Sequence, residues 1–487
     1  MFCLIISLPI FFLILPVKKI TAKTDLMFNK EVYTDRRNKL RNEVKSGIGL
    51  IMGNVEAAFN YPHNTYHFRQ DSHFLYFFGL QNPGFAGIID FDNNKDYIFG
   101  NDFDIDDVIW MGVQPKVVDL AATAGITNTA PYTELAKFIA DTKNEGREIH
   151  FLPTYRGETT IELSNLLGIS NADIKTAASV ELIKGVVKLK EIKSEEEIAE
   201  IEKAVDIAYE MHTTSMKMAM PGVVEQKIAG TIEGISLALG GPVSFPIILS
   251  QDGQTLHNHN HSNTLEVGRM MVTDAGAETQ ECYSSDITRT VPVGGKFNER
   301  QAEIYQIVLD ANMASIEAIK PNIKYREIHF LACRVIIEGL KKAGLMKGDT
   351  DAALKAEAHT LFMPHGLGHQ MGMDVHDMEG FGEDYVGYDE NTKRATTFGT
   401  AYLRLGKELK PGFVLTTEPG IYFIPDLIDQ FRAEGKFMDF INYDKVETYK
   451  DFGGIRIEDD ILVTETGNRV LGKPIPKTIE EVEAVMA

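Results

Sequence analysis

Three histidines lie within fourteen positions of the chain, in the run PHGLGHQMGMDVHD at residues 364–377. They are His365, His369 and His376, and three glycines separate them. Glycine gives up packing area and makes a regular helix costly. The run therefore predicts a loop or a strand end that holds imidazoles in fixed positions. The alternative is a glycine-rich surface loop that carries histidines without using them.

Four carboxylates stand at or near the ends of predicted strands, where they could act together with one of these histidines. Asp274 ends one strand and Asp286 begins the next, so a hairpin can bring both carboxylates together. Glu418 stands just before a Pro-Gly turn, and Glu458 lies in the run GGIRIEDD. Taken one at a time, acids in such positions are usually solvated.

Four acids and one histidine together favour a site for two divalent metal ions. Cations such as Mn²⁺ accept oxygen and imidazole ligands, and a two-metal centre needs bridging carboxylates. Four carboxylates balance the charge of two such ions, whereas without metal the cluster would repel itself strongly. Mn²⁺ best suits an oxygen-rich set of ligands, and Co²⁺ and Zn²⁺ also fit.

Strands must position these side chains, because alternate residues of a strand point to the same face. Asp286, Thr288 and Thr290 therefore share one face of a strand. In GGIRIEDD the same rule puts Arg456 and Glu458 on one face, with the intervening isoleucines packing behind.

The remaining patterns predict two domains. Residues 27–178 are expected to form a smaller αβ domain, from the strand-like runs GIGLIMGN, AGIIDFDNNKDYIFG and REIHFLPTYRG. Residues 179–475 are expected to combine long helices with antiparallel strands. Ser194 with Glu197 forms a capping box before the first long helix, and two more helices are expected after Asn298 and over YREIHFLACRVIIEGLKKAGL.

Composition excludes some classes of partner. The net charge is -21 and no strongly basic stretch offsets it, which argues against nucleic acid or an anionic membrane surface. Cys3, Cys282 and Cys333 are too few and too far apart for a disulfide framework or a zinc-cluster spacing. The sequence therefore favours a reducing compartment and a cytoplasmic location.

One segment departs from this pattern, the apolar run at residues 2–17 that ends in two lysines. It is short for a membrane span, has no basic region before it and is followed by no convincing cleavage site. Either it exports or anchors the protein, or the true start is Met27, where an amphipathic helix pattern begins. We expect the start at Met27, with residues 1–26 outside both domains.

Five runs that occur in order resemble a known family: DAGAE, SDITRT, PHGLGHQMGMDVHD, TTEPGIYF and GGIRIEDD. They are similar to the metal-binding blocks of the pita-bread metallopeptidases, which include aminopeptidase P and prolidase. FRQDSHFLYFFGL resembles the signature of the N-terminal domain that these enzymes share. The resemblance implies an α+β metallo-exopeptidase, with a C-terminal pita-bread (creatinase/aminopeptidase-like) catalytic domain after a smaller αβ domain of the aminopeptidase P type.

The same resemblance implies the metal ligands. They are Asp274, Asp286, His369, Glu418 and Glu458, with Asp286 and Glu458 as the bridges. His369 is thus the ligand among the three histidines of the opening run. Glu418 is also expected to pass a proton to the leaving nitrogen.

Other residues are implied to act on the substrate. His365 and His376 resemble residues that contact substrate or steady the tetrahedral intermediate, and His257 matches another active-site histidine. Arg404 sits where prolidases hold the substrate carboxylate, a role that suits a planar cation, and Arg456 is expected to bind substrate as well. The plain alternative for Arg404 is an exposed loop arginine.

The implied reaction removes an N-terminal residue that precedes proline. Proline forms a tertiary amide without an amide hydrogen, so a site shaped for its ring can select it. Arg404 and the long insertion between Glu418 and Glu458 resemble prolidases, which favours Xaa-Pro dipeptides slightly over longer peptides. The expected partners are proline-containing peptides and further copies of the chain, because relatives with this N-terminal domain are commonly dimers or larger.

Three other functions account for fewer features of the sequence. A non-catalytic peptide-binding relative and a metal-free, creatinase-like hydrolase would both be expected to lack metal-ligand positions, yet all five stand here. A methionine aminopeptidase would not need the N-terminal domain.

Overall fold

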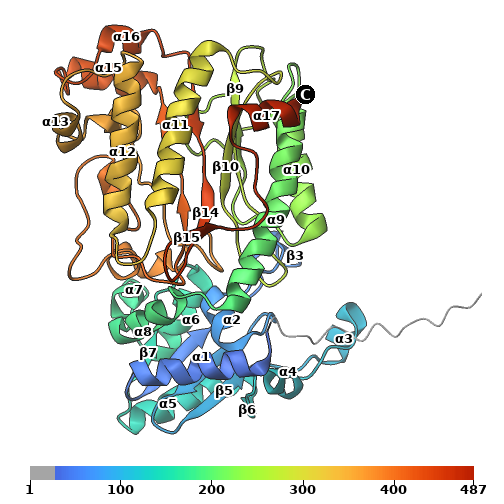
Figure 1. Cartoon of the computed structure of the whole chain (residues 1–487). Coiled ribbons are helices and arrows are strands. Elements are labelled where there is room, and N and C mark those ends of the chain that lie inside the picture. Colours follow the sequence, from blue (N-terminus) through green and yellow to red (C-terminus); the bar gives the residue numbers. More distant parts are fainter. Residues whose placement is uncertain (1–27) are drawn as a thin grey trace, which may run out of the picture.

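The computed structural model describes residues 28–487 and has two parts, which lie one below the other in Figure 1. The apolar run at residues 2–17 and the expected start at Met27 lie outside the described residues. Within residues 28–487, no helix combines the length and apolar character needed to cross a membrane. The expected domain boundary after residue 178 falls between two short helices and stays a prediction.

The N-terminal part is built on a five-stranded mixed sheet with the order β6-β5-β4-β1-β7. All three expected strand runs are found in it, and β4 and β5 form a hairpin, with Asp90 opposite Lys95. The sheet consists of β1 (Ile48–Met52), β4 (Ala86–Asp90), β5 (Lys95–Phe99), β6 (Asn128–Ala130) and β7 (Ile149–Phe151). Around it lie α1 (Lys30–Glu43), α2 (Ser72–Phe78), α4 (Val117–Thr123), α5 (Leu135–Asn144), α6 (Gly157–Leu167), α7 (Ile174–Ala177) and α8 (Val180–Lys190). The hairpin of β2 (Ala58–Tyr61) and β3 (Asn64–Thr65) and the helix α3 (Ile105–Met111) extend from it.

The C-terminal part has long helices outside and strands inside (Figure 1). Its main helices are α9 (Glu195–Met218), α10 (Glu225–Leu239), α11 (Glu299–Ala318), α12 (Tyr325–Lys342) and α17 (Ile479–Met486). Capping boxes at Ser194 and Asn298 begin α9 and α11, which confirms both expected helix starts. The sequence patterns did not predict α10.

Three small antiparallel sheets make up the interior of this part. They have the orders β10-β9-β8, β11-β14-β15 and β12-β13. The strands are β8 (Ile248–Ser250), β9 (Met270–Ala275), β10 (Ile287–Pro292), β11 (Val414–Thr417), β12 (Gly420–Tyr422), β13 (Gly454–Arg456), β14 (Asp459–Val463) and β15 (Asn468–Val470). The long insertion after β12 folds into α15 (Pro425–Ala433) and α16 (Tyr443–Glu447).

The expected strand that contains GGIRIEDD is divided in two. β13 pairs with β12 and β14 pairs with β11, and Glu458 lies at the crossing between them. The backbone N–H of Glu458 donates to the carbonyl of Thr288 (3.1 Å), so the gap in the ladder is satisfied by the neighbouring β10. Ile455 and Ile457 are fully buried behind this crossing, as their alternation predicts.

The N-terminal part contacts the histidine-rich run directly. Arg69 donates to the carbonyl of Met373 (2.9 Å), and Ser72 Oγ donates to Asp374 Oδ1 (2.6 Å). Arg69 and Ser72 belong to the run FRQDSHFLYFFGL. This run therefore joins the two parts of the protein beside the candidate site.

Candidate metal centre

A hairpin brings the first two expected ligands to one cavity. Asp274 lies in β9 and Asp286 immediately precedes β10, and the register pairs Thr288 with Asp274. Both carboxylates line a cavity of about 240 Å³. The sequence prediction of a carboxylate-bearing hairpin is thus confirmed.

The histidine-rich run pairs with β11, which ends immediately before Glu418. The backbone N–H of Thr416 donates to the carbonyl of His369 (3.0 Å), and that of Glu418 donates to the carbonyl of Leu367 (2.8 Å). A Cβ at Gly368 would lie 2.2 Å from the carbonyl oxygen of Thr416, so only glycine permits this approach. Gly368 thus serves close strand pairing, as expected of a strand end rather than an exposed loop.

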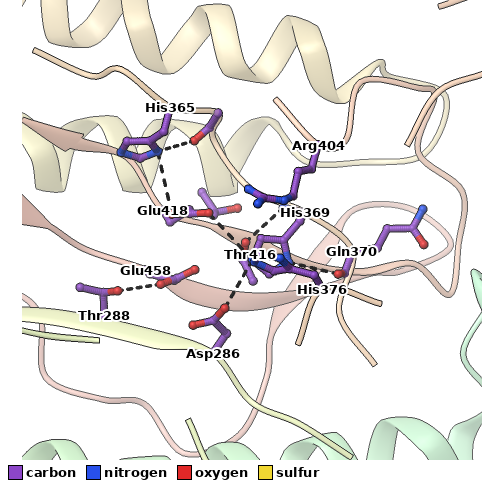
Figure 2. A network of polar contacts seen from close by, with 12 residues as sticks. Asp286, Thr288, His365, His369, Gln370, His376, Arg404, Thr416, Glu418 and Glu458 are labelled. Carbon is purple, nitrogen blue, oxygen red and sulfur yellow. Dashed lines mark hydrogen bonds and ion pairs between the residues drawn. The ribbon is translucent and has the colours of Figure 1, made fainter. Parts of the chain in front are cut away.

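All five expected ligands line this cavity, and three of them form its most compact group (Figure 2). Asp286, His369 and Glu458 each offer a ligand atom, and these atoms lie within 4.8 Å of one another. His369 Nε2 lies 3.4 Å from Asp286 Oδ2 and 3.9 Å from Glu418 Oε1. Among residues 28–487, nothing donates a hydrogen bond to the buried Oδ1 of Asp274.

Electrostatics make this cluster unfavourable without cations. Burial raises the pKa of Asp286 and Glu458 well above their usual range, and repulsion from the neighbouring carboxylates raises them further. Burial likewise raises the pKa of Glu418 to about 7. Burial lowers the pKa of His369, so its imidazole is neutral. Divalent cations would displace these protons and offset the repulsion between the carboxylates, and a neutral imidazole can bind a cation, so these residues fit two such ions.

Arg456 is hydrogen bonded to the cluster rather than free. Only 3 % exposed, it donates to Asp274 Oδ2 (2.5 Å), Thr288 Oγ1 (3.1 Å) and the hydroxyl of Tyr422 (2.8 Å). Thr288 Oγ1 donates in turn to Glu458 Oε2 (2.7 Å). These bonds fix the carboxylates in place. Arg456 also lines the cavity, and its expected contact with substrate stays a prediction.

The four other residues expected to act on substrate, which are His257, His365, His376 and Arg404, all line the same cavity. His365 Nε2 pairs with the hydroxyl of Tyr422 (3.0 Å). His376 Nδ1 and Arg404 Nε both contact the carboxylate of Glu379, at 2.5 Å and 3.4 Å.

Sequence reasoning missed three polar residues of the site. Tyr422 bonds both His365 and Arg456, and Glu379 bonds both His376 and Arg404. His259 also lines the cavity and pairs through Nδ1 with the carbonyl of Ile247 (3.3 Å). Alternation from Glu418 along TTEPGIYF, which gives Gly420 and Tyr422 the same face, could have singled out Tyr422.

Long helices around small antiparallel sheets, with buried carboxylates and an imidazole at one cavity, agree with the fold and site that the resemblance to the pita-bread metallopeptidases implies.

The chain belongs to metallopeptidase family M24, whose family model matches residues 199–465. A second model, the N-terminal domain of aminopeptidase P, matches residues 33–150. Both matches confirm the resemblance that the five ordered runs carry.

Individual relatives fall into both branches of this family. The chain is 32 % identical to the human Xaa-Pro dipeptidase over 91 % of this chain and 90 % of the relative. It is also 32 % identical to a probable Xaa-Pro aminopeptidase of Aspergillus niger, over 90 % of each chain. Among solved structures, a substrate complex of Escherichia coli aminopeptidase P is similar with a TM-score of 0.78 and 29 % identity, covering 94 % of this chain and 98 % of that one.

Proposed function

We propose that this protein hydrolyses the bond between an N-terminal residue and a following proline, with two divalent metal ions. The observation that carries the proposal is the shared cavity of the five residues Asp274, Asp286, His369, Glu418 and Glu458. Membership of family M24 and relatives that are named Xaa-Pro peptidases support it. The experiment that tests it measures release of alanine from Ala-Pro peptides as metal is removed and restored.

The five residues would hold the ions, with Asp286 and Glu458 as bridges. Bound divalent ions supply Lewis acidity, which makes a water more acidic and polarises the scissile carbonyl. The side chain of Glu418 is 20 % exposed toward the cavity, so it can accept the proton of the attacking water and return it to the leaving nitrogen. The hydrogen bond from the backbone N–H of Glu418 to the carbonyl of Leu367 fixes the main chain at this position.

Histidines at the cavity wall would bind the substrate and the developing negative charge. The hydroxyl of Tyr422 fixes the ring of His365, and Glu379 fixes that of His376. A ring held by a second hydrogen bond keeps one orientation and one tautomer. His257, which is exposed at the same cavity, would complete this wall.

Arg404 is proposed to bind the carboxylate of a dipeptide. Its side chain is 36 % exposed at the cavity, and Glu379 alone pairs with it at 3.4 Å in the part of the chain that the structure describes. This long contact leaves most guanidinium donors available for a carboxylate. Dipeptidase activity is therefore slightly favoured, and aminopeptidase activity on longer peptides is the alternative.

Replacing Arg404 with methionine is expected to raise KM for Ala-Pro by about 10- to 150-fold, because hydrogen bonds to charged groups contribute about 1.5–3 kcal/mol. KM for Ala-Pro-Ala-Ala is expected to change little, since its carboxylate lies farther along the peptide. Mass spectrometry of both peptides with Mn²⁺-loaded protein measures this, with Asp286→Ala as the blank. Arg394→Met is the matched control, because Arg394 pairs with Glu383 (2.9 Å) instead. Equal changes on both peptides would contradict the assignment.

The metal-free protein is expected to lose stability as pH rises from about 4.5 to about 7. Burial raises the pKa of Glu418 to about 7 from an ordinary 4.5, so in this window the folded state binds more protons than the unfolded state. The free energy of unfolding then falls as pH increases. Thermal unfolding after chelation measures this, with Glu418→Gln for comparison. The Tm of Glu418→Gln should rise relative to that of the natural protein as pH increases. A difference in Tm that stays constant with pH would contradict the prediction.

Three finer points are also proposed. Manganese is the preferred metal, because four of the five donors are carboxylates. A cytoplasmic location agrees with Cys282 and Cys333, which are both free thiols.

Further copies of the chain would cover the exposed apolar residues around α3, where Ile109 is 69 %, Trp110 84 % and Val113 80 % exposed. Metal analysis of the isolated protein and light scattering test the first and third points.

A further inference from the structure

A second cluster of metal-binding side chains lies outside the catalytic cavity. His329 and Cys333 are four residues apart on α12, so both point to the same face of that helix. His359 faces them from the short helix η2 (Ala358–Leu361), which packs against α12. All three side chains are buried, with 0 %, 0 % and 1 % exposure in that order.

The three side chains are close enough to share one cation. Each offers a donor atom, and these atoms lie within 4.8 Å of one another. Cys333 Sγ lies 3.6 Å from His329 Nε2, and the rings of His329 and His359 are 6.1 Å apart between centroids. Metal bonds of about 2.0–2.3 Å place donor atoms roughly 3.3–3.8 Å apart. The donor atoms of the three side chains must therefore move about 1 Å closer to one another to bind one ion.

His359 is the unusual member of this cluster. A neutral imidazole carries one N–H donor and one acceptor nitrogen. Within residues 28–487, neither ring nitrogen of His359 has a hydrogen-bond partner, although the side chain is almost fully buried. Buried polar groups are nearly always paired, so an imidazole without partners calls for a ligand.

We propose that His329, Cys333 and His359 form a site for one thiophilic cation, Cu⁺ or Zn²⁺. A thiolate with two imidazoles suits these ions, whereas Mn²⁺ prefers the carboxylates of the catalytic cluster. Binding replaces the thiol proton of Cys333, which leaves to solvent. The three cysteines alone have no zinc-site spacing, and the fold creates the site by adding histidines from two helices.

Charge distinguishes the two ions. One thiolate and two neutral imidazoles neutralise Cu⁺, so three ligands suffice for a fully buried site. Zn²⁺ would keep one positive charge and take a fourth ligand. Glu357, which lies two residues before His359 in the chain, is the candidate for this ligand.

A cation here would join α12 to the chain that enters the catalytic run. His359 precedes His365 by six residues, and His365 lines the catalytic cavity. The bound ion would therefore fix the start of the segment that carries His365 and His369. This role is structural, and the ion would not touch the substrate.

The test uses full-length protein with Cys3→Ser and Cys282→Ser, which leaves Cys333 as the single thiol. This protein is produced in medium supplemented with Zn²⁺ or copper. The metal at its catalytic site is then replaced with Mn²⁺, and the zinc or copper that stays bound is measured per chain. X-ray absorption then identifies the atoms around the retained ion. The matched variants carry Cys333→Ser or His359→Gln in addition. His150→Gln is the control, because His150 is a buried histidine outside this cluster.

The proposal expects about one retained equivalent with a sulfur neighbour at about 2.3 Å. This equivalent should vanish in Cys333→Ser, bind at least tenfold more weakly in His359→Gln, and persist in His150→Gln. Retention of Cu⁺ with three neighbours, or of Zn²⁺ with four, distinguishes the two ions. A retained ion without a sulfur neighbour, or none at all, would overturn the proposal. The X-ray absorption spectrum of the protein that keeps Cys333 shows whether sulfur binds the ion, even where a variant fails to fold.

Discussion

Asp286→Asn is expected to lower kcat/KM for Ala-Pro and for Ala-Pro-Ala-Ala by at least about 1,000-fold. Lewis-acid stabilisation contributes several kcal/mol, and each 1.36 kcal/mol is a factor of ten in rate. Asparagine keeps the size of the side chain but removes the charge that would bridge two ions. Mn²⁺ bound per chain should fall below two, as elemental analysis of the Mn²⁺-loaded protein after dialysis would measure.

The same substitution is expected to stabilise the metal-free protein. Burial and repulsion from Glu458 and Asp274 raise the pKa of Asp286, so the charged form is unfavourable in the folded state. An amide removes this repulsion. Thermal unfolding in chelator should give a higher Tm for Asp286→Asn than for the natural protein. Asp310→Asn, an exposed change on α11, is the control and should alter both activity and Tm little. A lower Tm for the metal-free variant would contradict this account.

Asp377→Asn is expected to lower the free energy of unfolding by about 3–5 kcal/mol, because it leaves two buried cations uncompensated. Asp377 is 0 % exposed at its side chain and pairs with Lys190 (3.0 Å) and Lys193 (2.9 Å). Burial alone would raise the pKa of Asp377, yet the two lysines lower it to about 2. Chemical denaturation followed by circular dichroism measures the loss.

An exposed ion pair provides the control for this prediction. Arg334 pairs with Asp351 (2.6 Å), whose side chain is 77 % exposed. Asp351→Asn is therefore expected to cost less than about 1 kcal/mol. Asp377→Asn should also raise KM, because Asp377 anchors the segment next to His376. Equal, small losses in both variants would show that the buried pair stabilises no more than a surface pair.

Local patterns in the sequence predicted the elements that hold the site. Capping boxes at Ser194 and Asn298 gave two helix starts, because the capping bonds join residues only three positions apart. Alternation predicted the shared faces of β10 and of the Arg456 strand. The family resemblance supplied the five cluster residues, which the fold brings to one cavity.

Contacts between distant segments could not be predicted in this way. The strand around Glu458 divides because its first part pairs with β12 and its second part pairs with β11. Only the assembled sheets show this. Tyr422 and Glu379 act through bonds to His365 and Arg404, which local periodicity does not reveal. The cluster of His329, Cys333 and His359 likewise exists only when η2 packs against α12.

The central claim is that these carboxylates and His369 form a two-metal centre that cleaves Xaa-Pro bonds. The most direct measurement is alanine release from Ala-Pro and Ala-Pro-Ala-Ala by chelator-treated protein, followed as Mn²⁺ is added back. The account predicts no release without metal and a rate that reaches its maximum at two equivalents per chain at the catalytic site. Alanine release that survives chelation, or that Mn²⁺ fails to restore on both peptides, would contradict it.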